Sequence, residues 1–137
     1  MRDYQFIGAT LLGSSSITAL VSTKVYHGLR YGASALSSMP CINYYNLPSK
    51  GRFSGMESKT FSIHCRAADP AVARQLGDLV VDLFGGTNGS GTYGNTTTFT
   101  VARASIIRDN GLIPEGEAGS YCVPIDVLIV YSVDTVS

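Results

Sequence analysis

The fold of this chain is constrained most by a segment of alternating apolar and polar residues that is followed directly by an amphipathic helix. Apolar and polar residues alternate over 61–67, which is typical of a strand with one buried face. Asp69-Pro70 follows as a preferred N-cap and a proline suited to the first helical position. Gly85-Gly86 predicts a left-handed end to a helix over about 69–84, which must cover one face of the sheet. Its expected apolar stripe is Val72, Leu76, Leu79, Val80 and Leu83.

The other segments complete a fold of the α+β class. The pattern predicts short helices at Arg2–Leu12 and Ile17–Val21, and a loop or hairpin tip at 87–95. A turn at Pro48–Gly55 would join the first two strands as an antiparallel hairpin. We expect a mostly antiparallel four- to five-stranded sheet with one main helix (about 69–84) and a short N-terminal helix packed on it. The remaining expected strands are Cys41–Leu47, Thr96–Arg108 with a bulge near Arg103, and Tyr121–Val133.

Length and charge narrow the class of protein. A chain of 137 residues fits one domain, so residues 1–137 are expected to form a single unit. Ten basic and ten acidic side chains argue against a dedicated nucleic-acid binder, which usually carries a basic face. No apolar run is long enough for a membrane helix, so we expect no membrane partner.

No residue set in the sequence has the pattern of an active site. The Gly89–Gly94 segment matches GxGxxG but follows a helix, whereas a phosphate-binding version follows a strand and opens a helix. His64 and Cys65 are neighbours on a strand and must face opposite ways, while Asp126 lacks a second carboxylate. Cys41, Cys65 and Cys122 are expected to be buried thiols. We therefore expect no enzyme activity, and no catalytic residue, cofactor or metal site.

Two loops of opposite charge remain as candidate interaction surfaces. They are either ordinary solvated loops or the two sides of a head-to-tail contact between copies, which is how rings form. The basic loop also carries an aromatic side chain. Its residues are Lys50, Arg52, Phe53 and Lys59, and the acidic loop has Asp109, Glu115 and Glu117.

The order of these segments resembles the tail completion proteins of the tail terminator family of long-tailed bacteriophages. The resemblance is one of order and hydrophobicity over almost the whole chain. In the first third it rests on Ala9–Leu12, Ile17–Ser22, Val25–Tyr26 and Met39–Tyr44. Further on it rests on Thr60–Ala67, Pro70–Phe84 and Ser120–Tyr131.

The resemblance implies a structural virion protein at the head–tail junction, assembled in the host cytoplasm. Such proteins form a homo-oligomeric ring, here expected to be a hexamer, on the end of the tail tube, stop its growth and join it to the head connector or stopper protein. Genomic DNA passes through the lumen without sequence-specific binding, and the Asp109–Glu117 loop is a candidate lining. A neck or head-completion adaptor ring on the portal side is the alternative, and a small-ligand binder or enzyme is a more distant one.

Overall fold

The computed structural model describes residues 3–28, 39–53, 56–85, 89–92, 97–115 and 119–135, with side chains at 6–28, 39–47, 57–85, 104–115 and 119–131. Helices and strands follow one another in separate runs, as expected of an α+β domain. In the first half they are α1 (Asp3–Leu12), α2 (Ser15–Val21), β1 (Val25–His27), β2 (Cys41–Phe53) and β3 (Met56–Ala67). In the second half they are α4 (Pro70–Phe84), β4 (Gly89–Thr92), β5 (Thr97–Asp109), β6 (Ile113–Pro114) and β7 (Tyr121–Thr135).

The described strands form one sheet in the order β1-β2-β3-β7-β5-β4, with β6 paired to β7 as well. The β1–β2 pair is parallel, and the other described pairs are antiparallel. The α+β class with a mostly antiparallel sheet is thus confirmed. The sheet has seven strands instead of the expected four or five. The additional strands have four residues or fewer, too short to show an alternating pattern, and they form by pairing with long neighbours.

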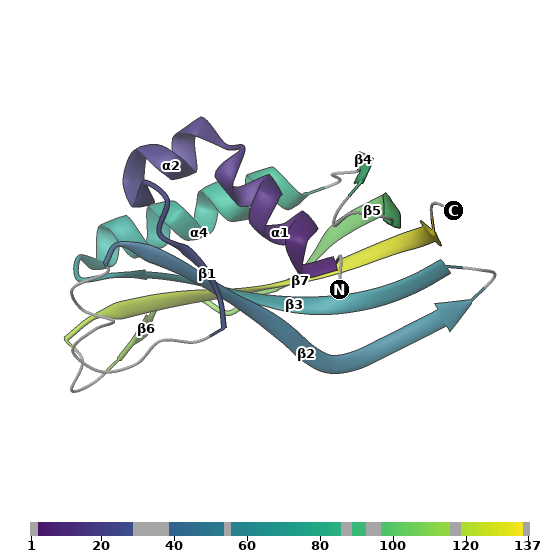
Figure 1. The fold of residues 1–137 in the computed structure, drawn as a ribbon. Helices are drawn as coiled ribbons and strands as arrows, with labels where there is room; N and C mark the ends of the chain where they lie inside the picture. Colours follow the sequence, from purple (N-terminus) through teal and green to yellow (C-terminus); the bar gives the residue numbers. More distant parts are fainter. Residues whose placement is uncertain are drawn as a thin grey trace.

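The helices α1, α2 and α4 all lie on one face of the sheet (Figure 1). The hydrophobic core fills the space between this helical layer and the inner faces of β2, β3 and β7. Along β7 the inward positions from Val123 to Ile129 are completely buried at every second residue, as the alternation predicted. The largest fully buried side chains include Phe61, Phe84, Ile7, Leu11, Leu76 and Ile125.

The main helix begins as predicted, but its buried face is rotated and its end differs. Asp69 caps it by accepting a 2.8 Å hydrogen bond from the backbone N–H of Ala71. Small residues at Ala73 and Gly77 let the helix approach the sheet closely, so Val72, Leu79 and Leu83 remain only half-buried. Gly85 has φ −69° and ψ 100°, so the predicted left-handed end is wrong at this residue. The buried residues are Ala73, Leu76, Gly77, Val80 and Phe84.

The predicted turn at Pro48–Gly55 is wrong for most of its length, because β2 continues through it to Phe53. The pairing with β3 shifts register between Asn46 and Lys50, which accommodates a proline that cannot donate a ladder hydrogen bond. This part of β2 is at the edge of the sheet among the described strands. The long β2–β3 hairpin therefore extends past the helical layer (Figure 1).

Two irregularities interrupt the pairing of β5 with β7. One lies between Val101 and Arg103, which confirms the predicted bulge. The second lies between Ile106 and Arg108, so Ile107 has no partner in the β7 register. Within the described ranges, no helix is both long and apolar enough to cross a membrane.

Candidate assembly surface

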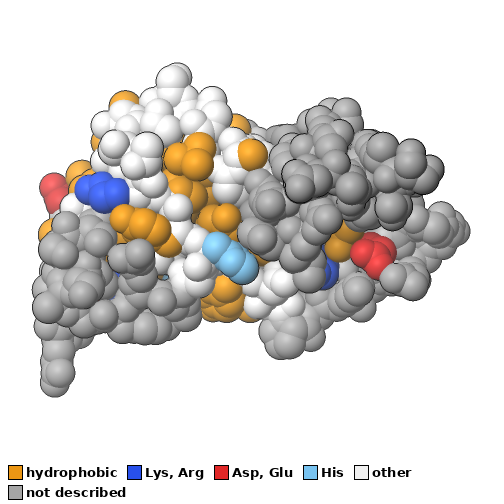
Figure 2. Space-filling model, in the orientation of Figure 1, with side chains coloured by type: hydrophobic (Ala, Val, Ile, Leu, Met, Phe, Trp, Pro, Cys, Tyr) orange, Lys and Arg blue, Asp and Glu red, His pale blue; other side chains and the backbone are white. Residues whose placement is uncertain are grey.

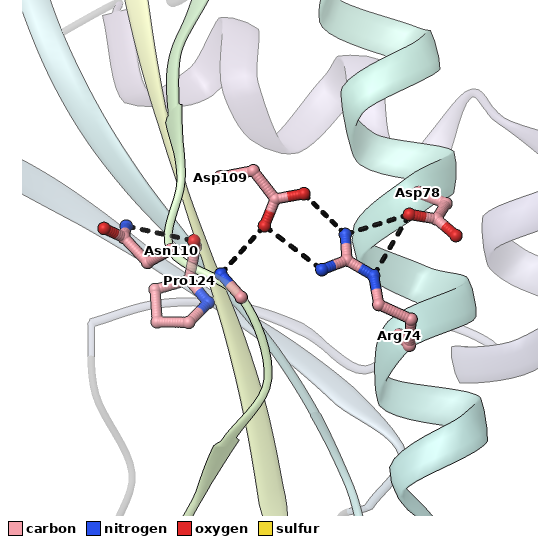
Figure 3. A network of polar contacts seen from close by, with 6 residues as sticks. Arg74, Asp78, Asp109, Asn110 and Pro124 are labelled. Carbon is pink, nitrogen blue, oxygen red and sulfur yellow. Dashed lines mark hydrogen bonds and ion pairs between the residues drawn. The ribbon is translucent and has the colours of Figure 1, made fainter.

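An arginine on α4 holds the end of β5. The Arg74 guanidinium donates two hydrogen bonds to the Asp109 carboxylate, at 3.1 and 2.7 Å, and another to Asp78 at 3.1 Å (Figure 3). These bonds hold the pKa of Asp109 below its usual value and raise that of Arg74. The Asp109 carboxylate is therefore already paired within the chain, and it shares Arg74 with Asp78.

The turn that follows Asp109 is fixed by its own hydrogen bonds. The backbone N–H of Asn110 donates to the carbonyl oxygen of Pro124 at 3.0 Å. The side-chain amide of Asn110 donates to the same oxygen at 3.1 Å (Figure 3). Gly111 has φ +77°, which favours glycine, and its N–H donates to the Asp109 carboxylate at 2.9 Å. The turn is thereby held in one conformation on the end of the sheet.

A second arginine neutralises the next acidic residue. Arg66 on β3 donates from Nε and Nη2 to the two Glu115 carboxylate oxygens, each at 3.0 Å. The Ser120 hydroxyl donates to the same carboxylate at 2.8 Å, and the Arg66 side chain is only 3% exposed. This buried ion pair fastens the segment after β6 onto the face of the sheet opposite the helices. Glu117, the third predicted acidic residue, lies outside the described residues.

An exposed apolar segment, which we call the 107–113 tip, includes Asp109 of the first ion pair and ends shortly before Glu115 of the second. It contains Ile107 (49% exposed), Leu112 (42%) and Ile113 (44%). Among the described residues Leu12 is the one other large hydrophobic residue with comparable exposure. Exposed aliphatic side chains gathered in a fixed turn are typical of an interaction surface.

The basic candidate residues lie in the β2–β3 hairpin. Lys50 faces Lys59 in the ladder, and Arg52 faces Glu57. Lys59 is largely buried, with 9% exposure, so it does not belong to a freely solvated loop. The side chains of Lys50, Arg52 and Phe53 fall outside the described set, and their role stays a prediction.

A serine and a histidine meet on the helix-free face of the sheet. His64 Nε2 lies 3.0 Å from the Ser62 hydroxyl, and Asp126 faces Ser62 across the β3–β7 ladder. Burial, and then the charge of Arg66, lower the pKa of His64. Ser62 is only 3% exposed, and within the described residues no hydrogen bond links His64 to Asp126. The arrangement therefore lacks the accessible nucleophile and the oriented base of a hydrolytic triad.

The three cysteines are free and buried, as expected. Cys65 faces the helical layer and Cys122 the opposite side. Burial raises the pKa of both thiols, to about 12 for Cys122, so they are poor nucleophiles. No cluster of three or more metal-ligating side chains occurs in the described part of the chain.

Figure 2 shows one face of the molecule, in the orientation of Figure 1. Charged side chains of the described residues are few there, and hydrophobic side chains lie between them and below the helices.

Sequence reasoning identified the acidic residues but missed their partners. The Arg74–Asp78 spacing of four residues is a recognisable helical pair. Arg66 and Glu115 are separated by 49 residues, and no local pattern indicates such a contact. The 107–113 tip could have been found, because aliphatic residues flank its Asn110-Gly111 turn.

No family model matches the sequence, and no curated protein matches it. A chain of the solved structure described as "Virion of native gene transfer agent (GTA) particle" has a similar fold, with a TM-score of 0.66 and 16% sequence identity. The match covers 95% of this chain and 91% of that one. The protein therefore shares its fold, over nearly its entire length, with a polypeptide of a virion particle.

Proposed function

We propose that this protein is a structural virion component that acts as a tail terminator. In this proposal it forms a ring, expected to be a hexamer, on the last layer of the tail tube. The ring ends tube growth and presents a surface to the head connector or stopper protein. The observation that carries the proposal is the nearly full-length fold likeness to a chain of a gene transfer agent virion.

The geometry of the described surface is consistent with a role in assembly. A ring subunit needs two side contacts as well as contacts above and below, and standard interfaces bury about 800 Å² per partner. The 107–113 tip and the extended β2–β3 hairpin lie outside the core formed by the helices and the sheet. The fold can thus provide contact surfaces without exposing its own core.

DNA passes through the proposed lumen, so the residues that line the lumen should not bind it tightly. Glu115 is paired with Arg66, and Asp109 shares Arg74 with Asp78, so arginines of the same chain largely compensate the acidic residues of this region. A nearly neutral lining would let a polyanion slide, because strong binding requires phosphate neutralisation by several cations. In this proposal the candidate lining within the Asp109–Glu117 loop is its last part, Glu115 to Glu117, which follows the exposed aliphatic residues Leu112 and Ile113 in the sequence.

Deleting the gene and examining the resulting particles by electron microscopy tests the function. Tail tubes of uncontrolled length that do not join heads are the expected result. Tubes of normal length, on wild-type-like particles, would contradict it. Normal tails beside heads that fail to join, with the protein found only on heads, would instead indicate the neck adaptor on the portal side.

A further inference from the structure

A partner could desolvate the 107–113 tip at little electrostatic cost. Its three aliphatic side chains are 42–49% exposed, while the carboxylates of Asp109 within the tip and Glu115 after it are paired with Arg74 and Arg66. Covering the tip would therefore desolvate apolar area without stranding those charges. The hydrogen bonds of Asn110 and Gly111 fix the turn in advance, which reduces the entropy lost on docking.

One exposed cation accompanies these aliphatic side chains. Arg108 lies in β5 next to Ile107, and Asp126 faces it across the ladder with β7. Within the described residues, no ion pair or hydrogen bond engages the Arg108 side chain. The tip therefore presents aliphatic area with one positive charge at its margin.

The last turn of α4 carries a negative charge beside partly exposed apolar side chains. Asp82 is exposed there and is not engaged in an ion pair with another described residue. Leu79 and Leu83, near it in sequence and one turn apart on the helix, are half-buried and leave part of their surface uncovered. This α4 edge, defined by Leu79, Asp82 and Leu83, matches the tip in apolar character and complements it in charge.

The two surfaces cannot meet within one molecule. Asp109 is tied to Arg74, so the tip lies near the beginning of α4, whereas Asp82 lies eight residues further on, roughly 12 Å along the helix axis. Arg108 shares the side of the sheet turned away from the helices with Asp126. A contact between tip and α4 edge must therefore join different copies.

We propose that the 107–113 tip of one copy docks on the α4 edge of a second copy, with Arg108 of the first near Asp82 of the second. The contact is head-to-tail, because each copy uses a different surface on its two sides, and repetition of such a contact closes rings. The inference rests on the proposed ring and assigns its side contact. Three partly exposed side chains make a small contact, so a Kd of roughly 0.1–1 mM is expected for one pair of copies.

Sedimentation velocity of the purified protein at low salt, up to about 1 mM protein, tests the contact. Asp82→Arg places two positive charges together and should weaken association about fivefold to tenfold. Arg108→Asp should do the same, and the double reversal should recover the wild-type Kd to within about twofold. Ile113→Ser should weaken association about fivefold to tenfold. Leu12→Ser is its matched control, since both side chains are 44% exposed.

Each outcome either supports or contradicts the proposed contact. Restored association in the double reversal supports it, whereas a wild-type chain that stays monomeric at 1 mM overturns it. If the wild type associates but neither the reversals nor Ile113→Ser change the Kd, the side contact lies elsewhere and the ring itself is unaffected. Asp82→Arg lies on an exposed helix position, so this variant decides the matter even if Arg108→Asp, which faces Asp126, lowers stability. The terminator function is tested separately by the gene deletion.

Discussion

Glu115 neutralises Arg66 across 49 residues of sequence, through two parallel hydrogen bonds of 3.0 Å each. Because the arginine is 3% exposed and the glutamate 21%, most of this ion pair has been removed from water. Such a buried pair favours a single position of the Glu115 segment on the sheet, because burying either charged side chain without the other would be costly.

Removing Glu115 should therefore be destabilising. Glu115→Ala removes the carboxylate that accepts two hydrogen bonds from the buried Arg66 guanidinium, and we expect a loss of about 3 kcal/mol in the free energy of unfolding. Urea unfolding measures it. The double variant Arg66→Met, Glu115→Leu should recover most of the loss, because neither charge is then buried. Asp78→Ala is the control, since that carboxylate is 67% exposed and should contribute less than about 0.5 kcal/mol. A loss as small as this control's in Glu115→Ala would contradict the assignment.

Gly77 allows α4 to approach β7, and a larger residue should not fit. A Cβ atom there would lie 2.6 Å from Val123 Cγ1 and 3.2 Å from Val123 Cβ. Alanine improves helix propensity by about 1 kcal/mol, but overpacking costs about 1–3 kcal/mol, so Gly77→Ala should be destabilising by roughly 1 kcal/mol. Thermal denaturation of Gly77→Ala in a Val123→Ala background is the complementary measurement. There the 2.6 Å approach to Cγ1 is gone, while the approaches to Cβ of residue 123 (3.2 Å) and to Arg74 Nη2 (3.0 Å) remain, so the same change should cost less than in the wild-type background.

His64 should make stability depend on pH near neutrality. Its pKa is lowered in the folded protein, first by burial and then by Arg66, so the unfolded chain binds the proton more readily. Stability should therefore decrease as the pH falls below about 6.5, the value of an unperturbed histidine. His64→Gln, followed by thermal melting between pH 5.5 and 7.5, should reduce this slope. An unchanged slope would show that other groups carry it.

Asp109 should make the folding stability depend on pH as well, but at more acidic values than His64. Its pKa is lowered, chiefly by the Arg74 hydrogen bonds, so its contribution is present above about pH 4 and is lost as the pH falls through the folded value. Both partners are about one-third exposed, and we expect Asp109→Asn to cost at most about 1 kcal/mol at pH 7. Melting curves of variant and wild type should converge toward pH 2.5. A constant difference across this range would show that the effect is not electrostatic.

The proposed lumen lining is best tested at Glu117. Glu115→Lys would also break the buried pair with Arg66, so a defect in that variant would have two causes. Glu117→Lys adds a cation to the candidate lining and should slow genome ejection while particles still assemble. Timing DNA release from purified virions measures it. Wild-type ejection kinetics would remove this loop from the lumen.

The local patterns of the sequence were sufficient for most of the fold. Alternation predicted β3 and β7, and Asp69-Pro70 predicted the start of α4. The prediction failed where tertiary pairing overrides local chemistry. Pro48 and Gly51 are typical of a turn, yet β3 pairs with this segment and draws it into a strand.

The candidate site could be predicted only in part. The acidic loop was recognisable from its residue types, and the structure adds that Asp109 and Glu115 are each bonded to an arginine. Those arginines come from β3 and α4, and only the sheet order brings them to the β5–β7 end. Which residues in a loop remain free to bind a partner depends on such contacts, and no spacing in the sequence encodes them.

The position of β7 determines when this chain can fold. Among the described strands, β7 alone connects the β1-β2-β3 half of the sheet to the β5-β4 half. A nascent polypeptide that ends before Tyr121 would lack the strand that joins the β2–β3 and β4–β5 hairpins into one sheet, and with it the buried side chains of Val123, Ile125, Val127 and Ile129. Long-range pairing of this kind slows folding. Translation of 121–135 would then be the step that joins the two halves into one sheet.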